Sequence, residues 1–332
     1  MRVLAGHDGG SGCAWYRVVL PLSELGKHGH QVTIGTAGTE AVRSRRGQFD
    51  VIVGSMLAGH DPSQLGTWRR LSAHGRLVYE IDDDPFSVET VNWQAYSTFA
   101  RADVIDSVSH AAEVASLVTV TTEPLARVMR QHNPNVAVLP NCVPGWVCDH
   151  QRPRRDRLRV GWAGGASHGR DIQLVTRPVR EFLNRNPGWD GHLVGTDYRP
   201  AVKHDRVGFT NWVSVMGNPR AFYESLDFDV GLAPLQWTVF ASSKSCIKAL
   251  EYAALGIPVI ATDAEPYRDF VVHGVTGFLV KRDHEWLGYL QQLAADAGLR
   301  ESMGAKAREH ARAFTIEQNW WRWERAYSAL LH

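Results

Sequence analysis

The chain has 332 residues, of which 44% are hydrophobic, which suffices for about two ordinary domains with packed cores and excludes a disordered chain. Its 36 basic and 35 acidic residues give a formal net charge of +1. This balance argues against a dedicated nucleic-acid clamp or a polybasic membrane anchor. No apolar run approaches the ~20 residues that span a bilayer, so neither a signal peptide nor a transmembrane segment is expected.

The four cysteines, Cys13, Cys142, Cys148 and Cys246, form no CxxC pair. They are too few for a disulfide framework in a chain of this length, so a reducing, cytoplasmic compartment is expected.

Short apolar runs alternate with longer segments of helical periodicity, which is typical of parallel strands joined by helical crossovers. In the first half, strands are predicted at residues 2–5, 31–34, 50–53, 76–81, 117–121 and 136–139. In the second half, they are predicted at residues 158–163, 192–194, 206–209, 228–233, 257–261 and 278–280. The predicted fold class is α/β, with two Rossmann-like doubly wound parallel-sheet domains facing each other across a cleft.

A domain boundary is predicted near residue 150, where prolines, a glycine and an arginine run interrupt the pattern. The arginines are consistent with a solvated linker face or with a surface toward an anionic substrate. The domains then span residues 1–150 and 151–314. Residues 315–332 carry an apolar stripe and predict a closing helix, with packing against the first domain as one option.

The first predicted strand is followed by the glycine-rich turn GHDGGSGCAWYR, which leads into a helix that starts near Ala14. A turn of this kind at Gly10, Ser11 and Gly12 lets backbone N–H groups approach an anion, with a simple tight turn as the alternative. Trp15 stands where a dinucleotide fingerprint needs its third glycine, and the sequence contains no P-loop motif. Nicotinamide or flavin enzymes and P-loop kinases are therefore disfavoured.

Three adjacent carboxylates, Asp82, Asp83 and Asp84, follow the fourth predicted strand. At a strand's carboxyl end they could bind sugar hydroxyls, hold a divalent cation or serve as a base. Asp82 and Asp83 are the candidates for cleft residues. Asp84 precedes Pro85 and is the candidate for a capping role.

The second half opens with another glycine-rich turn, VGWAGGASHGRD, which contains Gly165, His168 and Arg170. An arginine beside such a turn suits a diphosphate, because the guanidinium forms paired hydrogen bonds. His168 fits a ligand contact or a surface or capping histidine equally well.

The stretch TVFASSKSCIKALEYAALGIPVIATD predicts a helix that begins at residue 242 or 243. Lys244, Lys248 and Glu251 would then share one face, and the first N–H groups would come from Lys244, Ser245 and Cys246. Those N–H groups and the lysines could hold phosphate oxygens, and Glu251 could bind a ribose diol. An ordinary amphipathic surface helix is the alternative.

At these residues the sequence resembles the GT-B nucleotide-sugar glycosyltransferases, most closely their large retaining family 4 group. The resemblance covers both glycine turns, the runs VTVTTEPLA and VLPNCVP, and KALEYAALGIPVIATD through HGVTGFLV. Glu251 matches the second glutamate of the family's E-x7-E pattern, which holds the donor ribose. The first glutamate, which usually touches the donor sugar, is replaced by Ser243, and the next residues resemble a subgroup with a KS-x-x-K pattern.

The resemblance implies an acceptor-side first domain and a nucleotide-sugar donor domain after it. The implied catalytic residues are Asp82, Asp83, Arg170 and Lys244. The implied donor-binding residues are Gly10, Ser11, Gly12, Gly165, His168, Arg170, Thr210, Asn211, Lys244, Ser245, Cys246, Lys248 and Glu251.

The implied reaction moves a sugar from a UDP- or GDP-sugar to a hydroxyl of a glycan, small molecule or protein, with retention of anomeric configuration. The nucleotide sugar is a co-substrate, no cofactor is required, and a metal ion is not implied, although Asp82–Asp84 leave a divalent ion open. Three alternatives remain: a dinucleotide-dependent oxidoreductase, a degenerate sugar-nucleotide-binding or scaffold protein, and a transferase acting on a protein or modified DNA. The near-zero net charge weighs against DNA.

Overall fold

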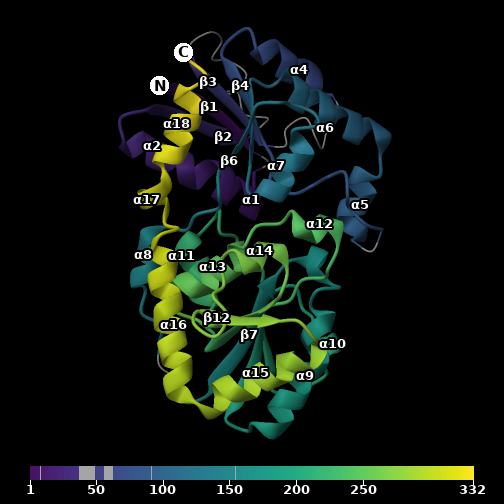
Figure 1. Cartoon of the computed structure of the whole chain (residues 1–332), viewed down its shortest axis with the longest axis vertical. Helices are drawn as coiled ribbons and strands as arrows, with labels where there is room; N and C mark the ends of the chain where they lie inside the picture. The colour runs from purple at the N-terminus through teal and green to yellow at the C-terminus, as the bar shows by residue number, and fades with distance from the viewer. Residues whose placement is uncertain (8, 37–48, 56–62, 91, 154) are drawn as a thin grey trace. The chain divides into compact units, whose positions relative to one another are not determined.

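A computed structural model of the chain describes residues 1–7, 9–36, 49–55, 63–90, 92–153 and 155–332. The chain forms two compact units (Figure 1). Unit 1 consists of Met1–Cys142, Ser243–Ser245 and Ile316–His332. Unit 2 consists of Val143–Ser242 and Cys246–Thr315. The chain thus passes from unit 1 to unit 2 after Cys142, and two later segments, Ser243–Ser245 and Ile316–His332, belong to unit 1.

Unit 1 contains a parallel six-stranded sheet in the order β2-β1-β3-β4-β5-β6. Its strands are β1 Arg2–His7, β2 Gln31–Thr36, β3 Val51–Ser55, β4 Arg76–Glu80, β5 Leu117–Val120 and β6 Val136–Val138. The helical segments are α1 Gly12–Ala14, the π-helix η1 Trp15–Val19, α2 Leu20–Lys27, α4 Gln64–Leu71, α5 Trp93–Phe99, α6 Ala102–Val114, α7 Glu123–Met129, α17 Ile316–Asn319 and α18 Trp321–Ser328. Strand order reverses beside β1, which is where doubly wound sheets bind ligands.

The central strands of unit 1 are apolar because helices cover the sheet and leave these strands almost no solvent contact. Trp68 of α4 is buried against Tyr79 of β4, with ring centroids 6.2 Å apart. The indole N–H of Trp68 donates to the Ala111 carbonyl of α6 at 3.1 Å, which ties the two helices together.

The closing segment forms two short helices, α17 and α18, so the prediction of one continuous helix is wrong. Trp323 and Tyr327 are fully buried, and both helices contact α2 of unit 1. Trp320, between the helices, stacks on His28 with ring centroids 3.7 Å apart. The apolar stripe is therefore used for packing although the helix is interrupted.

Unit 2 contains a second parallel six-stranded sheet, in the order β12-β11-β10-β7-β8-β9. Its strands are β7 Leu158–Gly164, β8 Trp189–Gly195, β9 Val207–Asn211, β10 Val230–Ala233, β11 Val259–Thr262 and β12 Gly277–Val280. The helical segments are α8 Gly145–Asp149, the 3-10 helix η2 Ala166–His168, α9 Gln173–Arg185, α10 Arg199–Val202, α11 Pro219–Ser225, α12 Val239–Ser242, α13 Ile247–Ala254, α14 Glu265–Arg268, α15 Asp283–Ala295 and α16 Ala297–Arg312.

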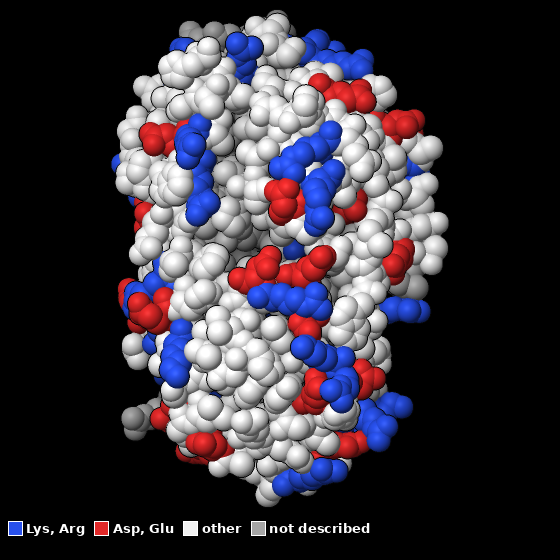
Figure 2. Space-filling model, viewed as in Figure 1, with Lys and Arg blue, Asp and Glu red and all other residues white. Residues whose placement is uncertain are grey.

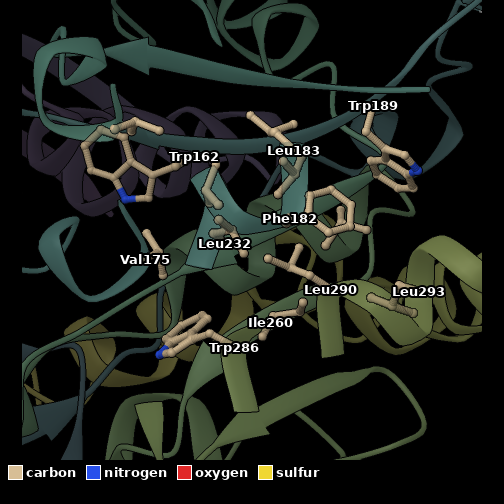
Figure 3. Packing of buried hydrophobic residues seen from close by; sticks show 14 of the residues in the cluster. Trp162, Val175, Phe182, Leu183, Trp189, Leu232, Ile260, Trp286, Leu290 and Leu293 are labelled. Carbon is tan, nitrogen blue, oxygen red and sulfur yellow. The ribbon is translucent and has the colours of Figure 1, made fainter. Parts of the chain in front are cut away.

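The core of unit 2 is built around large aromatic side chains (Figure 3). Trp162 of β7 is buried in the same cluster as Val175 of α9, and Phe182 and Trp189 pack edge to face with centroids 5.3 Å apart. Trp286 and Leu290 of α15 join the same cluster. Several of the 12 tryptophans are thus core residues rather than ligand contacts.

Every predicted strand is present, with ends that shift by a few residues, and the two-domain Rossmann-like α/β class is confirmed. No helix among the described residues is long and apolar enough to cross a membrane. On the face shown in Figure 2, basic and acidic side chains are intermixed, in keeping with the balanced net charge.

Candidate functional site

The first glycine turn lies at the carboxyl end of β1 and leads into α1. Gly9 has a positive φ of 100°, and its N–H donates to His7 Nδ1 at 3.0 Å. Ser11 is the N-cap of α1, since its Oγ accepts a hydrogen bond from the Ala14 N–H at 3.0 Å. The helix thus begins at Gly12, two residues before the predicted start. A β-carbon at Gly10 or Gly12 would meet no atom of the described residues within 4 Å, so packing among these residues does not require glycine there.

The three aspartates after β4 have separate environments. Asp84 is buried and accepts hydrogen bonds from the Phe86 N–H at 2.9 Å and from Ser87 Oγ at 2.6 Å. It therefore stabilises a turn, in agreement with its predicted separation from the other two. Asp82 and Asp83 are partly exposed. Adjacent residues at a strand end point to different sides, which accounts for their different partners.

Asp82 lies beside the thiol of Cys13 and shares a hydrogen bond with it. Burial and the negative charge of Asp83 raise the pKa of Asp82, while Cys13, Arg17 and Lys244 act in the opposite direction. Burial and the two carboxylates also raise the pKa of the Cys13 thiol. Cys13 therefore stays protonated near neutral pH and donates to the carboxylate.

Asp83 forms an ion pair with Lys244. Lys244 Nζ lies 2.9 Å from Asp83 Oδ1 and 3.2 Å from Oδ2. Burial disfavours the charged amine, but the Asp83 carboxylate together with Asp82 and Cys13 outweighs this and raises the pKa of Lys244. The structure thus brings three predicted catalytic residues, Asp82, Asp83 and Lys244, together in unit 1.

Two residues that the sequence analysis did not single out hold the segment around Lys244. Thr122 Oγ1 donates to the Ser243 carbonyl at 2.8 Å, and Asn141 Nδ2 donates to Ser245 Oγ at 2.8 Å. Thr122 lies in VTVTTEPLA and Asn141 in VLPNCVP, the two runs already noted as similar to the family. The similarity of these two runs to the family pointed to the right segments, but it did not indicate the roles of Thr122 and Asn141.

A buried ion pair is connected to this cluster through Asn141. Arg17, in the π-helix η1, donates through Nε to Glu80 Oε1 at 2.7 Å and through Nη1 to Asn141 Oδ1 at 3.0 Å. Thr119 Oγ1 donates to Glu80 Oε2 at 2.5 Å. Burial raises the pKa of Glu80 to about 7, with Arg17 acting against it. Sequence reasoning missed this pair because nothing in a strand pattern marks a buried charge.

In unit 2, some glycines of the second glycine-rich turn are required by packing, and one remains a candidate for ligand contact. A β-carbon at Gly161 would lie 1.9 Å from the Phe228 ring, and one at Gly164 would lie 2.5 Å from the Trp162 ring. These two glycines are required by packing within the unit. Gly165 makes only ordinary contact with Trp212 at 3.6 Å and remains a candidate for ligand approach.

His168 and Arg170 follow this turn. His168 Nδ1 lies 2.8 Å from Asp171 Oδ2, which fixes the ring. Arg170 is exposed, and among the described residues its guanidinium has no ion-pair partner. Its charge is thus available to an anionic ligand, whereas His168 is already bonded within unit 2.

Thr210 and Asn211 end β9. Thr210 Oγ1 lies 2.9 Å from His192 Nε2, and burial together with Arg159 lowers the pKa of His192 to about 4. His192 is therefore neutral at pH 7. Asn211 Oδ1 accepts from the Trp212 N–H at 2.8 Å, and the Trp212 side chain is 54% exposed.

The helix α13 begins at Ile247 with Cys246 as N-cap, so the predicted start at residue 242 or 243 is wrong. Ser243–Ser245 belong to unit 1 and are not helical. Lys244 and Lys248 therefore do not share a helix face, and the N–H groups of Lys244 and Ser245 do not belong to the helix terminus, whereas Cys246 is its N-cap. The half-buried Cys246 has its pKa raised to about 12 by burial.

Lys248 and Glu251 lie on α13 in unit 2. Lys248 Nζ donates to the Ala163 carbonyl near the end of β7 and lies 5.4 Å from the centroid of the Trp162 ring. The Ala163 N–H donates to Tyr252 Oη at 3.0 Å, so α13 is fixed to the second glycine turn through both backbone groups of Ala163. Glu251 is 7% exposed. Among the described residues there is no cluster of three potential metal ligands.

Residues 202–310 match the family model described as glycosyl transferases group 1, a segment that includes α13. A D-inositol 3-phosphate glycosyltransferase of Jonesia denitrificans is 45% identical over 69 residues, which cover 20% of this chain and 16% of that protein. The corresponding protein of Actinosynnema mirum is 38% identical over 85 residues, or 25% of this chain and 19% of that protein. The matches thus span less than a fifth of these relatives.

Solved structures resemble the chain over its whole length. Sucrose-phosphate synthase of Thermosynechococcus elongatus aligns with a TM-score of 0.71 and 17% identity over 100% of this chain and 99% of that one. HepE of Anabaena, solved in complex with UDP and glucose, aligns with a TM-score of 0.71 and 15% identity over 99% and 100%. At this identity the likeness concerns the fold. The chain therefore has the two-domain GT-B fold and carries a glycosyl transferases group 1 domain at residues 202–310.

Proposed function

We propose that the protein is a glycosyltransferase that moves a sugar from a UDP- or GDP-sugar to a hydroxyl acceptor with retention of anomeric configuration. The observation that carries this proposal is the match of residues 202–310 to a glycosyltransferase family model, over a segment in which Lys248 and Glu251 lie on a helix fixed to a glycine turn. The complex of HepE with UDP and glucose supports a nucleotide-sugar donor.

In this proposal, Arg170, Lys244 and Lys248 bind the donor diphosphate, and Glu251 accepts hydrogen bonds from the ribose. The turn at Gly10, Ser11 and Gly12 and the turn at Gly165 would let phosphate or sugar oxygens approach the backbone, since their glycines carry no β-carbon. Thr210 and Asn211 bind near the nucleobase, with His168, Ser245 and Cys246 completing the donor contacts.

The reaction breaks the bond between the anomeric carbon and the diphosphate oxygen and forms a bond from that carbon to the acceptor oxygen. The acceptor proton passes to the departing diphosphate on the same face, so no protein nucleophile is needed. The basic side chains stabilise the charge that develops on the diphosphate, and Asp82 and Asp83 orient the transferred sugar.

The nucleotide sugar serves as co-substrate in this scheme, with no further cofactor and no metal ion. The acceptor is a glycan, a small molecule or a protein hydroxyl. The cytoplasm is the proposed compartment.

A thermal-shift panel of UDP-, GDP-, ADP- and TDP-sugars tests the donor, because a ligand that binds only the folded state raises its stability. A shift of the melting temperature with UDP- or GDP-sugars alone is expected. Lys248→Met should abolish the shift, whereas Lys281→Met is the matched control, since Lys281 is an exposed lysine of unit 2. An equal shift in both variants would contradict the assignment of Lys248.

A second candidate is a sugar-nucleotide-binding protein without transferase activity. It is favoured by Ser243, which replaces the family's first glutamate and is 2% exposed, with its carbonyl bonded to Thr122. Release or transfer of sugar from the donor found in the panel would rule this candidate out.

A further inference from the structure

Lys244 forms an ion pair with Asp83, although the proposed function assigns the same lysine to the donor diphosphate. Both Asp83 oxygens lie within hydrogen-bond distance of Lys244 Nζ, at 2.9 and 3.2 Å. The Lys244 side chain is 22% exposed and that of Asp83 is 37% exposed. A carboxylate in this position presents two oxygens to the amine, as a phosphate group would.

The backbone around Lys244 is held independently of this pair. The Ser243 carbonyl accepts from Thr122 Oγ1, and Ser245 Oγ accepts from Asn141 Nδ2, each at 2.8 Å. Asn141 is in turn bonded to the buried Arg17. The hydrogen bonds that hold the segment therefore do not depend on which partner the Lys244 amine has.

The oxygens of Asp83 lie within hydrogen-bond distance of the amine, and Asp82 and Cys13 act on it through their charge. Asp82 shares its hydrogen bond with the Cys13 thiol, and its ionised form is disfavoured by burial and by Asp83. Lys244 is partly buried, and the nearby charge of Asp83 offsets part of the cost of burying its amine, because an uncompensated buried charge is costly.

We propose that Asp83 holds Lys244 in the ligand-free protein as an internal substitute for a donor phosphate, and that donor binding transfers Lys244 from the carboxylate to the diphosphate. This inference rests on the proposed function and adds a role for Asp83 that the sequence did not indicate. Asp83 keeps the amine charged and positioned before the donor binds, and it lowers the apparent affinity for the donor, because the ion pair has to be broken.

The test is a double-mutant cycle read out by calorimetric titration with UDP and with GDP. Asp83→Asn removes the competing charge and keeps the size of the side chain, and Lys244→Met removes the amine and keeps its apolar stem. We expect Asp83→Asn to tighten binding by up to about fivefold, the upper end of the range of an exposed ion pair. In the Lys244→Met background, Asp83→Asn should change the dissociation constant by less than about twofold.

Asp50→Asn is the matched control, since Asp50 pairs with Arg2 at 3.0 Å in the same unit but precedes β3 rather than following β4. It should leave the affinity unchanged. If Asp83→Asn tightened nucleotide binding equally in the natural and Lys244→Met backgrounds, the effect would come from long-range repulsion between Asp83 and the nucleotide. That result would overturn the proposed exchange of partners at Lys244. Weaker binding in Asp83→Asn would mean that Asp83 contacts the ligand and would also overturn it. Absence of binding in every variant, with unchanged melting temperatures, would instead contradict the proposed function itself.

Discussion

Arg17 Nε donates to Glu80 Oε1 at 2.7 Å, and both side chains are completely buried in unit 1. Arg17 also donates to the Leu139 carbonyl at 2.6 Å and to Asn141, so one guanidinium joins the helix after β1 to β4 and to the segment after β6. Through Asn141, which donates to Ser245 Oγ, the pair is connected to the segment that carries Lys244.

Arg17→Met should lower the free energy of unfolding by about 3–5 kcal/mol at pH 8, because it leaves the Glu80 carboxylate buried without its partner. Urea denaturation measures this change. The double variant Arg17→Met with Glu80→Leu should recover a large part of the loss, since no charge is then buried. A double variant as unstable as the single one would show that packing of the arginine stem, rather than charge, is responsible.

Stability should fall as the pH rises through the pKa of Glu80. Burial raises this pKa from 4.5 to about 7 in the folded state, with Arg17 acting against it. Between these values the unfolded chain has already lost the proton that the folded protein keeps. The stability that the folded protein gains from keeping the Glu80 proton is therefore complete below pH 4.5 and is lost by about pH 7. Denaturation at several pH values should show this slope in the natural protein and a smaller one in Glu80→Gln.

Arg170→Ala should reduce turnover by about 10²–10³-fold, since a group that stabilises the leaving diphosphate is removed. The melting temperature should stay the same, because Arg170 is exposed. Arg177→Ala is the control, as Arg177 is an 80% exposed arginine of α9 that pairs with Glu181. Initial rates with the donor identified by thermal shift provide the comparison, and full activity in Arg170→Ala would remove this residue from the proposed site.

Gly161→Ala should destabilise unit 2 by about 1–3 kcal/mol through overpacking, since its β-carbon would lie 1.9 Å from the Phe228 ring. Gly188→Ala should have little effect, because nothing lies within 4 Å of its β-carbon. Chemical denaturation of both variants tests the packing role. Equal stability of the two would show that β7 and Phe228 readjust without cost.

Transfer activity should persist in excess chelator, since lysine and arginine side chains supply the positive charge in the proposed mechanism. The assay compares initial rates with and without EDTA after dialysis. Loss of activity that added Mg²⁺ or Mn²⁺ restores would instead assign a cation to the Asp82–Asp84 region.

Much of the fold could be predicted from local pattern. Strands buried on both sides read as apolar runs, and the restart of the pattern after the linker indicated a second sheet. The predicted start of α13 was about one turn too early, because the helical spacing of Lys244, Lys248 and Glu251 begins before the true start at Ile247. The residues before it bond to Thr122, Asp83 and Asn141 of unit 1 instead of continuing the helix.

The sequence by itself determined the α/β class, the two glycine turns and the candidate residues at strand ends, since these depend on periodicity and on residue types at fixed spacing. Only the tertiary structure decided which of these residues have partners. Pairing of Lys244 with Asp83 joins positions 161 residues apart, and burial of Arg17 with Glu80 joins positions 63 apart. Such contacts depend on how distant segments pack and on the cost of burying charge, neither of which a local pattern contains.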